Sequence, residues 1–217
     1  MARPQVTLKL ATSLDGKIAL ANGMSEWITG EKARAEGRKL RANHDAIAVG
    51  ANTAVLDNPQ LTTRLSGEPN PIRVIFDTKL RLSPKSNLAL TAKETPVWVF
   101  SDVTTGDVAE TLQEQGVRLI KTPVSLRIDL EAALQILHDN GVSSLLVEGG
   151  GTLAASFFKL DAIDVIEWFR APIILGGDSR GSIGDLGLED MNLAKRFNRI
   201  EIRDLGDDIH ERYERIS

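Results

Sequence analysis

Residues 145–158 read LLVEGGGTLAASFF, an apolar run that ends at Glu148, then three glycines, then a second apolar run that begins after Thr152. The spacing predicts a buried strand that turns directly into a helix. Glycines let a main chain approach a ligand closely, and the first turn of a helix offers unpaired N–H groups and a positive dipole end. The stretch therefore indicates either a phosphate or pyrophosphate site or a tight strand-to-helix turn without a ligand.

Strand and helix patterns alternate on both sides of this turn. Apolar strand patterns occupy residues 5–11, 45–51, 72–77, 96–100, 117–122, 143–150 and 163–175, and helical patterns occupy residues 29–41, 107–116, 128–141 and 151–160. Residues 197–216 alternate on both sides of Gly206 and predict a closing antiparallel hairpin. The order predicts an α/β fold with three layers, a mainly parallel mixed sheet and a C-terminal hairpin, in a single domain over residues 1–217.

Composition excludes several classes of function. The 217 residues carry a net charge of −4 and no cysteine, so we expect no nucleic-acid partner, no disulfide, no thiolate catalysis and no zinc–thiolate site. His44, His138 and His210 are far apart and not in ligand spacing, so we expect no metal. Eighteen apolar residues never follow one another, and no signal peptide is visible, so we expect no membrane span and a cytoplasmic protein.

A second candidate stretch is GANTAVLDNPQLTTR, residues 50–64, which follows a strand and contains an Asn-Pro break. Asp57 is either a turn or cap carboxylate or a catalytic group, and the first reading is commoner. Arg64 considered by itself indicates only a solvated side chain.

A third candidate is the polar stretch 25–45. Arg34, Arg38 and Arg41 are spaced by four and three residues, which places them along one face of a helix. That face is either solvated or binds an anion. Trp27 is either a core or rim residue or a residue that stacks on a ligand.

Five stretches together resemble a known family. They are RPQVTLKLATSLDGKIA (3–19), SEWITG (25–30), LRANHDAIAVGANTAVLDNPQLTTR (40–64), VEGGGTLAASFF (147–158) and APIILGG (171–177). In this order they resemble the reductase domain of the bacterial riboflavin-biosynthesis deaminase/reductase. The resemblance implies a dihydrofolate-reductase-like fold and a homodimer, for which residues 164–175 offer one candidate surface. It also implies a free-standing reductase, or a fragment, that has no deaminase domain.

The same resemblance implies the reaction. The expected function is the NADPH-dependent reduction of 5-amino-6-(5-phosphoribosylamino)uracil to the ribitylamino product, with hydride added at ribose C1′. One alternative is a reductase of the same fold that acts on the diamino-pyrimidinone precursor, on a pterin or on another imine. A further alternative is a non-catalytic NADP-binding partner.

Site residues follow from the resemblance by their positions in the motifs. The residues implied for the phosphoribosyl substrate are Ser25, Arg41, Leu61, Arg64 and Glu148. Those implied for the cofactor are Ala11, Trp27, Thr53, Asp57, Thr78, Gly149, Gly150, Gly151, Thr152 and Leu153. Asp57 and Lys9 are the implied catalytic residues, whereas Arg34 and Arg38 keep a solvated role.

Overall fold

The structure, a computed structural model, describes residues 2–122 and 128–216. The chain divides into two compact units. The first unit comprises Met1–Gln5 and Arg38–Leu146, and the second comprises Val6–Gly37 and Val147–Ser217. The single domain expected over residues 1–217 stays a prediction.

The first unit contains parallel strands connected by helices. Its strands follow the order β7-β3-β4-β5-β6, in which β3 pairs with β4, β4 with β5 and β5 with β6, each in parallel. The strands are β3 (Ala46–Gly50), β4 (Ile72–Phe76), β5 (Val97–Phe100), β6 (Val117–Ile120) and the first part of β7 (Ser144–Glu148). The helices are α2 (Ala51–Leu56), α3 (Asn87–Leu90), α4 (Asp107–Glu114), α5 (Leu130–Asp139) and the second part of α1 (Glu31–Ala42).

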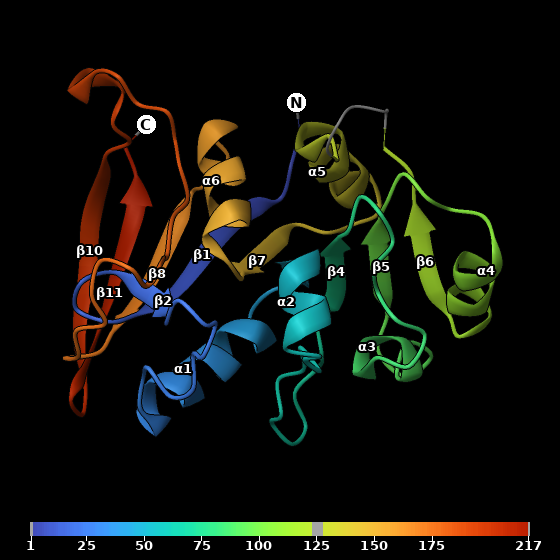
Figure 1. Ribbon diagram of the computed structural model, residues 1–217, viewed down its shortest axis with the longest axis horizontal. Helices are drawn as coiled ribbons and strands as arrows, with labels where there is room; N and C mark the ends of the chain where they lie inside the picture. The colour runs from blue at the N-terminus through green and yellow to red at the C-terminus, as the bar shows by residue number, and fades with distance from the viewer. Residues whose placement is uncertain (1, 123–127, 217) are drawn as a thin grey trace. The chain divides into compact units, whose positions relative to one another are not determined.

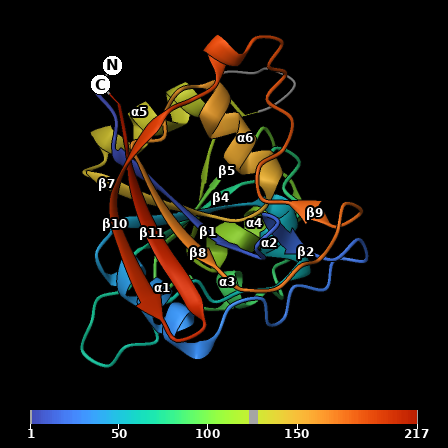
Figure 2. The ribbon, with the colours of Figure 1, turned by 90° about the vertical axis from the view of Figure 1, so that its left-hand side faces the viewer.

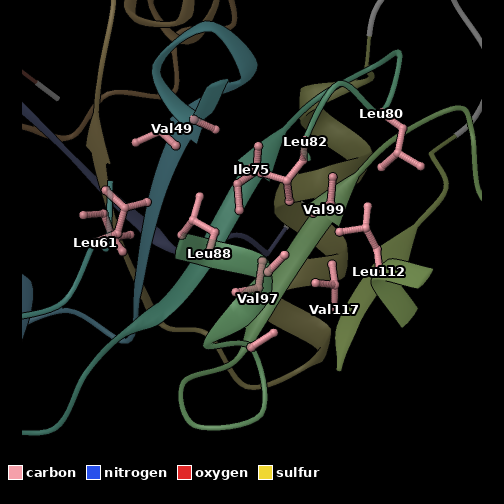
Figure 3. Close-up of a cluster of buried hydrophobic side chains, with 14 of the residues drawn as sticks. Val49, Leu61, Ile75, Leu80, Leu82, Leu88, Val97, Val99, Leu112 and Val117 are labelled. Carbon is pink, nitrogen blue, oxygen red and sulfur yellow. The ribbon is translucent and has the colours of Figure 1, made fainter. Parts of the chain in front are cut away.

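A cluster of buried aliphatic side chains holds these strands and helices together (Figure 3). Ile75 and Val99 contribute from neighbouring strands, and Leu112 contributes from α4. The strand residues are apolar almost throughout, because a parallel strand with covered faces has no side that meets water. Arg73 departs from this pattern most clearly, since it is the second residue of β4 and is fully buried.

The second unit combines parallel and antiparallel pairing. Its strands follow the order β10-β11-β8-β1, in which β1 pairs with β8 in parallel, while the β8–β11 and β11–β10 pairs are antiparallel. Figures 1 and 2 show β10 and β11 as a long hairpin beside β8. The elements are β1 (Gln5–Thr12), β2 (Lys17–Ala19), β8 (Val165–Arg170), β9 (Arg180–Gly181), β10 (Phe197–Leu205), β11 (Asp208–Arg215), α6 (Gly151–Lys159), the 3-10 turn Met191–Leu193 and the first part of α1.

The predicted fold class is confirmed: a mainly parallel mixed sheet carries helices and ends in an antiparallel hairpin. The strand expected over residues 163–175 is shorter than predicted and ends at Arg170, two residues before Pro172. The candidate dimer surface over residues 164–175 is wrong for its strand portion, because β8 lies between β1 and β11 and buries Val165, Ile166 and Phe169. The homodimer itself stays a prediction.

Several short features were not predicted. Residues 51–56 form the helix α2 in a stretch for which no helix was predicted, and residues 191–193 form a 3-10 turn. Residues 87–90 form the short helix α3, which lies outside the predicted helical ranges. Residues 17–19 and 180–181 form the two-stranded pair β2–β9, which joins segments more than 150 positions apart in sequence. None of these segments is long enough to carry a recognisable hydrophobic period.

Candidate active site

The glycine turn lies at the carboxyl end of β7 in the second unit. Gly149 has φ +144, which L side chains rarely adopt, and Gly150 precedes the first residue of α6. The N-cap residue of α6 is Gly150, which has no side chain with which to cap the helix. The first turn of this helix therefore presents main-chain N–H groups and the positive end of its dipole, as an anion site requires.

Gly151 is held against a second glycine-rich segment. A Cβ added at Gly151 would lie 2.6 Å from the Gly181 carbonyl oxygen and 3.0 Å from the Gly184 nitrogen. Gly184 donates its N–H to the Gly151 carbonyl at 2.9 Å. A Cβ added at Gly150, by contrast, would meet no heavy atom of the described residues within 4 Å. The turn is thus supported on the Gly151 side and open on the Gly150 side.

The Asp15 carboxylate accepts hydrogen bonds from the main chain shortly before the glycine-rich segment that packs on Gly151. Its Oδ1 accepts from the Ser13 hydroxyl at 2.5 Å and from the Leu175 N–H at 3.1 Å, and its Oδ2 accepts from the Gly176 N–H at 2.8 Å. The Ser182 N–H reaches the Gly16 carbonyl at 3.0 Å. The turn after β1, formed by Asp15 and Gly16, therefore fixes the segment that packs on Gly151.

We expect the Asp15 carboxyl to titrate with a pKa of about 2, below its ordinary value of 3.8. The Ser13 hydroxyl is the largest cause, and it outweighs the opposing effect of partial desolvation, while the N–H groups of Leu175 and Gly176 lower the pKa further. Because the folded pKa is depressed, the contribution of Asp15 to stability is present above pH 3.8 and is lost as pH falls towards 2. Carbon-detected NMR titration of the side chain measures this directly. A midpoint near 3.8 in the wild type would contradict the role, and Ser13→Ala should raise the midpoint.

Trp27 lies in the loop before α1 and is 71% exposed. The Arg34 guanidinium lies over its ring, with Cζ 4.5 Å from the ring centroid. Arg34 also donates to the Thr29 carbonyl at 2.6 Å and to Glu31 at 2.7 Å. Arg34 is a partly exposed surface residue that also contacts the loop that carries Trp27 and the exposed Ser25.

Lys9 and Ala11 lie on β1, and both are half-buried. The Lys9 Nζ lies 5.6 Å from the centre of the Phe169 ring on β8. The aliphatic part of the Lys9 side chain lies next to Gly37 of α1, because a Cβ added at Gly37 would lie 3.6 Å from Lys9 Cε. Glu148, at the carboxyl end of β7, is also half-buried.

In the first unit, the predicted residues Thr53 and Asp57 lie on the segment that follows β3, and Thr78 lies just after β4. Thr53 is half-buried on α2, and its carbonyl accepts the N–H of Asp57, which ends that helix. The Asp57 side chain is exposed. Thr78, which follows β4, is half-buried, and its carbonyl accepts the N–H of Asp102 at 3.1 Å.

Arg41 and the segment that carries Arg64 are brought together. Arg41 donates from Nη1 to the Thr62 carbonyl at 3.0 Å. Arg64 is exposed and has φ +53. Leu61 is 3% exposed and packs in the aliphatic core, so any contact of Leu61 with a ligand comes from its main chain.

Neither a metal-binding cluster nor a membrane-spanning helix is found in the part of the chain that the structure describes. Among residues 2–122 and 128–216, no group of three or more His, Asp or Glu side chains is arranged to hold a metal ion. Within the same ranges, no helix has the length and hydropathy needed to cross a bilayer.

Comparison with known families matches nearly the whole chain. Residues 4–210 match the model described as the RibD C-terminal domain. The riboflavin biosynthesis protein RibD of Bacillus amyloliquefaciens is 39% identical over 212 residues, which cover 95% of this chain and 56% of that protein. The chain thus spans about half the length of the curated RibD proteins that it matches.

Two further relatives bear on the fold and the substrate. The 2,5-diamino-6-ribosylamino-4(3H)-pyrimidinone 5′-phosphate reductase of Methanothermobacter thermautotrophicus is 36% identical over 215 residues, which cover 97% of this chain and 98% of that protein. The crystal structure of a Thermotoga maritima diaminohydroxyphosphoribosylaminopyrimidine deaminase/5-amino-6-(5-phosphoribosylamino)uracil reductase has a TM-score of 0.82 and 32% identity, covering 99% of this chain and 57% of that one.

Proposed function

The chain belongs to the RibD C-terminal domain family, and from this premise we propose that it is an NADPH-dependent reductase of 5-amino-6-(5-phosphoribosylamino)uracil. The product of this reaction carries a ribitylamino chain. The observation that carries the proposal is the contact between Arg41 and the segment of Arg64. Two guanidinium groups, Arg41 at the end of α1 and Arg64 on the segment that Arg41 contacts, suit the doubly charged phosphate of a phosphoribosyl group, because each can donate two hydrogen bonds.

The residues of the second unit fit a nicotinamide dinucleotide. The uncapped first turn of α6, with open space beside Gly150, suits a pyrophosphate. We assign to the cofactor the turn Gly149–Leu153, Ala11 and Trp27 in the second unit and, as a separate set in the first unit, Thr53, Asp57 and Thr78. A bound NADPH supplies the hydride. Preference for NADPH over NADH is part of the proposal and is tested by comparing the two cofactors.

The reaction takes up one hydride and one proton. Opening of the ribosylamine ring first transfers the amine proton from nitrogen to the ring oxygen, which leaves a C1′=N imine and a free 4′-hydroxyl. Addition of hydride to C1′ and of a proton to nitrogen then gives the ribitylamine. We assign the proton transfer to Asp57, whose exposed carboxylate can exchange protons with water, and the placement of charge near the reacting atoms to Lys9. Ser25, Arg41, Leu61, Arg64 and Glu148 are assigned to binding the phosphoribosyl substrate.

A second candidate substrate is the diamino-pyrimidinone that precedes deamination. The observation in its favour is the likeness to the Methanothermobacter thermautotrophicus reductase, almost all of which this chain spans. The two substrates share the phosphoribosyl end, so Arg41 and Arg64 would bind either of them. They differ at the pyrimidine ring, which carries one more amino group in the precursor.

One assay separates these functions. The chain is mixed with NADPH and either the uracil or the diamino-pyrimidinone, each with and without its 5′-phosphate, and NADPH consumption is followed. The higher kcat/KM identifies the substrate of the two. NADPH binding without turnover of either pyrimidine would overturn the proposal and favour a reductase of another imine or a non-catalytic NADP-binding partner.

Replacing Arg64 with Ala should raise the KM for the phosphorylated substrate and leave kcat little changed. A charge-assisted contact contributes roughly 1.5–3 kcal/mol, or on the order of tenfold to a hundredfold in KM. Arg118→Ala is the matched control, because it removes the same charge from β6, where Arg118 stacks on Trp98. If the dephosphorylated substrate reacts as well as the phosphorylated one in the wild type, Arg64 does not bind phosphate.

A further inference from the structure

The segment 58–64 is held in an unusual main-chain conformation. Asn58, Leu61 and Arg64 have φ values of +40, +54 and +53. A left-handed conformation costs roughly 1–2 kcal/mol for an ordinary L residue and less for Asn. Three such residues within seven positions persist only where surrounding contacts impose the conformation, and such strain concentrates at functional sites.

Several contacts impose it. Asn58 accepts the Asn87 N–H at its Oδ1 and the Asn87 side-chain amide at its carbonyl, both at 2.8 Å. The Thr63 N–H donates to Asn70 Oδ1 at 3.0 Å. The middle of the segment has a different support, because Arg73 donates from Nη1 to the Gln60 carbonyl at 3.2 Å.

Arg73 is an unexpected residue for this place. It is 0% exposed and is the second residue of β4, in a strand that is otherwise apolar. Besides Gln60, its guanidinium donates to the Thr91 hydroxyl at 2.8 Å, to the Thr91 carbonyl at 3.0 Å and to the Thr95 carbonyl. Burial lowers its pKa to about 10, so it stays charged at neutral pH.

A charge in this position is costly unless it does something that an apolar side chain cannot do. Replacing buried ionic groups with well-packed apolar groups is often neutral or stabilising, so core packing alone does not explain Arg73. Its guanidinium joins the carbonyl of Gln60, which immediately precedes Leu61, to the rigid turn 91–95. We propose that Arg73 is a positioning residue, which fixes the main chain of segment 58–64 so that Arg64 is presented to the substrate phosphate.

The identity of the ligand in this proposal rests on the proposed function, but the positioning role can be measured separately. Arg73→Lys keeps the charge but replaces the planar fork by a single ammonium, which does not reproduce the bonds to both Gln60 and Thr95. Leu112→Ala is the matched control, because it creates a cavity in the core of the same unit without touching segment 58–64. Thr91→Val is a milder second variant, because it removes one acceptor of Arg73 and leaves the charge in place.

Three measurements on the full chain decide the proposal: amide hydrogen exchange of residues 58–64, affinity for ribose 5-phosphate, and the KM and kcat of the reductase reaction. In Arg73→Lys we expect faster exchange confined to segment 58–64 and about a tenfold loss of ribose 5-phosphate affinity. We also expect a similar rise in KM with kcat little changed. Thr91→Val should show the same changes at smaller size, and Leu112→Ala should lower stability without them.

Each contrary outcome is informative. Unchanged exchange in segment 58–64 in both Arg73→Lys and Thr91→Val would overturn the positioning role, as would equal changes in Leu112→Ala. Failure of the wild type to bind ribose 5-phosphate would overturn the presentation of Arg64 to phosphate. Failure of the wild type to reduce either pyrimidine would overturn the proposed function, while exchange and ribose 5-phosphate affinity would still decide the role of Arg73.

Discussion

Replacing Asp57 with Asn should lower kcat by a factor on the order of 10² to 10⁴ while changing the KM for substrate much less. The amide keeps the shape of the side chain but neither donates nor accepts a proton at physiological pH. The main-chain contact of Asp57 with Thr53 is unaffected, so α2 should keep its end. Steady-state kinetics across pH provide the measurement, and the variant should lose the limb of the pH profile that reports on this carboxyl.

Asp107→Asn is the matched control, because Asp107 is an exposed carboxylate at the start of α4 in the same unit. It should leave kcat and KM unchanged. An unchanged kcat in Asp57→Asn would remove Asp57 from the chemistry. A rise in KM for NADPH with kcat retained would instead indicate that Asp57 orients ribose hydroxyls.

Replacing Gly151 with Ala should lower the free energy of unfolding by about 1–3 kcal/mol, the usual cost of an overpacked site. The new Cβ would lie 2.6 Å from the Gly181 carbonyl oxygen and 3.2 Å from the Ile183 carbonyl carbon. These atoms belong to the main chain and cannot rotate away as a flexible side chain can. Denaturant unfolding measures the loss, and calorimetry should show weaker binding of NADPH because the start of α6 shifts.

Substitution of the neighbouring Gly150 should lower NADPH affinity without lowering stability. Gly150 has φ −72, and its Cβ would meet no atom of the described residues within 4 Å, so Gly150→Ala should keep or raise stability by about 0.4–1 kcal/mol. The same Cβ would occupy the open side of the turn, so NADPH affinity should fall. Gly177→Ala, also in open space, should affect stability in the same way but leave NADPH affinity unchanged. Wild-type stability in Gly151→Ala would show that the segment 181–184 is free to move away.

Local pattern was enough to predict most strands and helices. The strand that ends at Glu148 and the helix that follows its glycines lie where residues 145–158 place them. The closing hairpin also has the predicted position. Alternation and glycine preferences act over a few residues, so they can be read without knowledge of the fold. The extent of β8 was overestimated, because the apolar run after it continues past the last paired residue.

The site residues were named from the family's motifs, and their environments could not be read from the sequence. Leu61 resembles any apolar loop residue in the sequence, yet its side chain belongs to the core. Arg34 and Arg41 share a helix face by spacing, but one stacks on Trp27 and the other reaches Thr62. Arg73 did carry a signal, since a lone charge in an apolar strand suggests a buried and hydrogen-bonded role.

The amino-acid sequence alone determined the alternation of elements and the glycine turn before α6, because each depends on residue type and on neighbours within a few positions. Only the tertiary structure decided that Arg73 supports Gln60, that Asp15 fastens the segment after residue 174, and that Gly151 has no room for a side chain. The side chains and the main-chain groups that they hold are far apart in sequence: Arg73 and Gln60 are 13 positions apart, and Asp15 and Gly176 are 161 positions apart. Such distances in sequence are closed by packing of the whole unit, which no local pattern encodes.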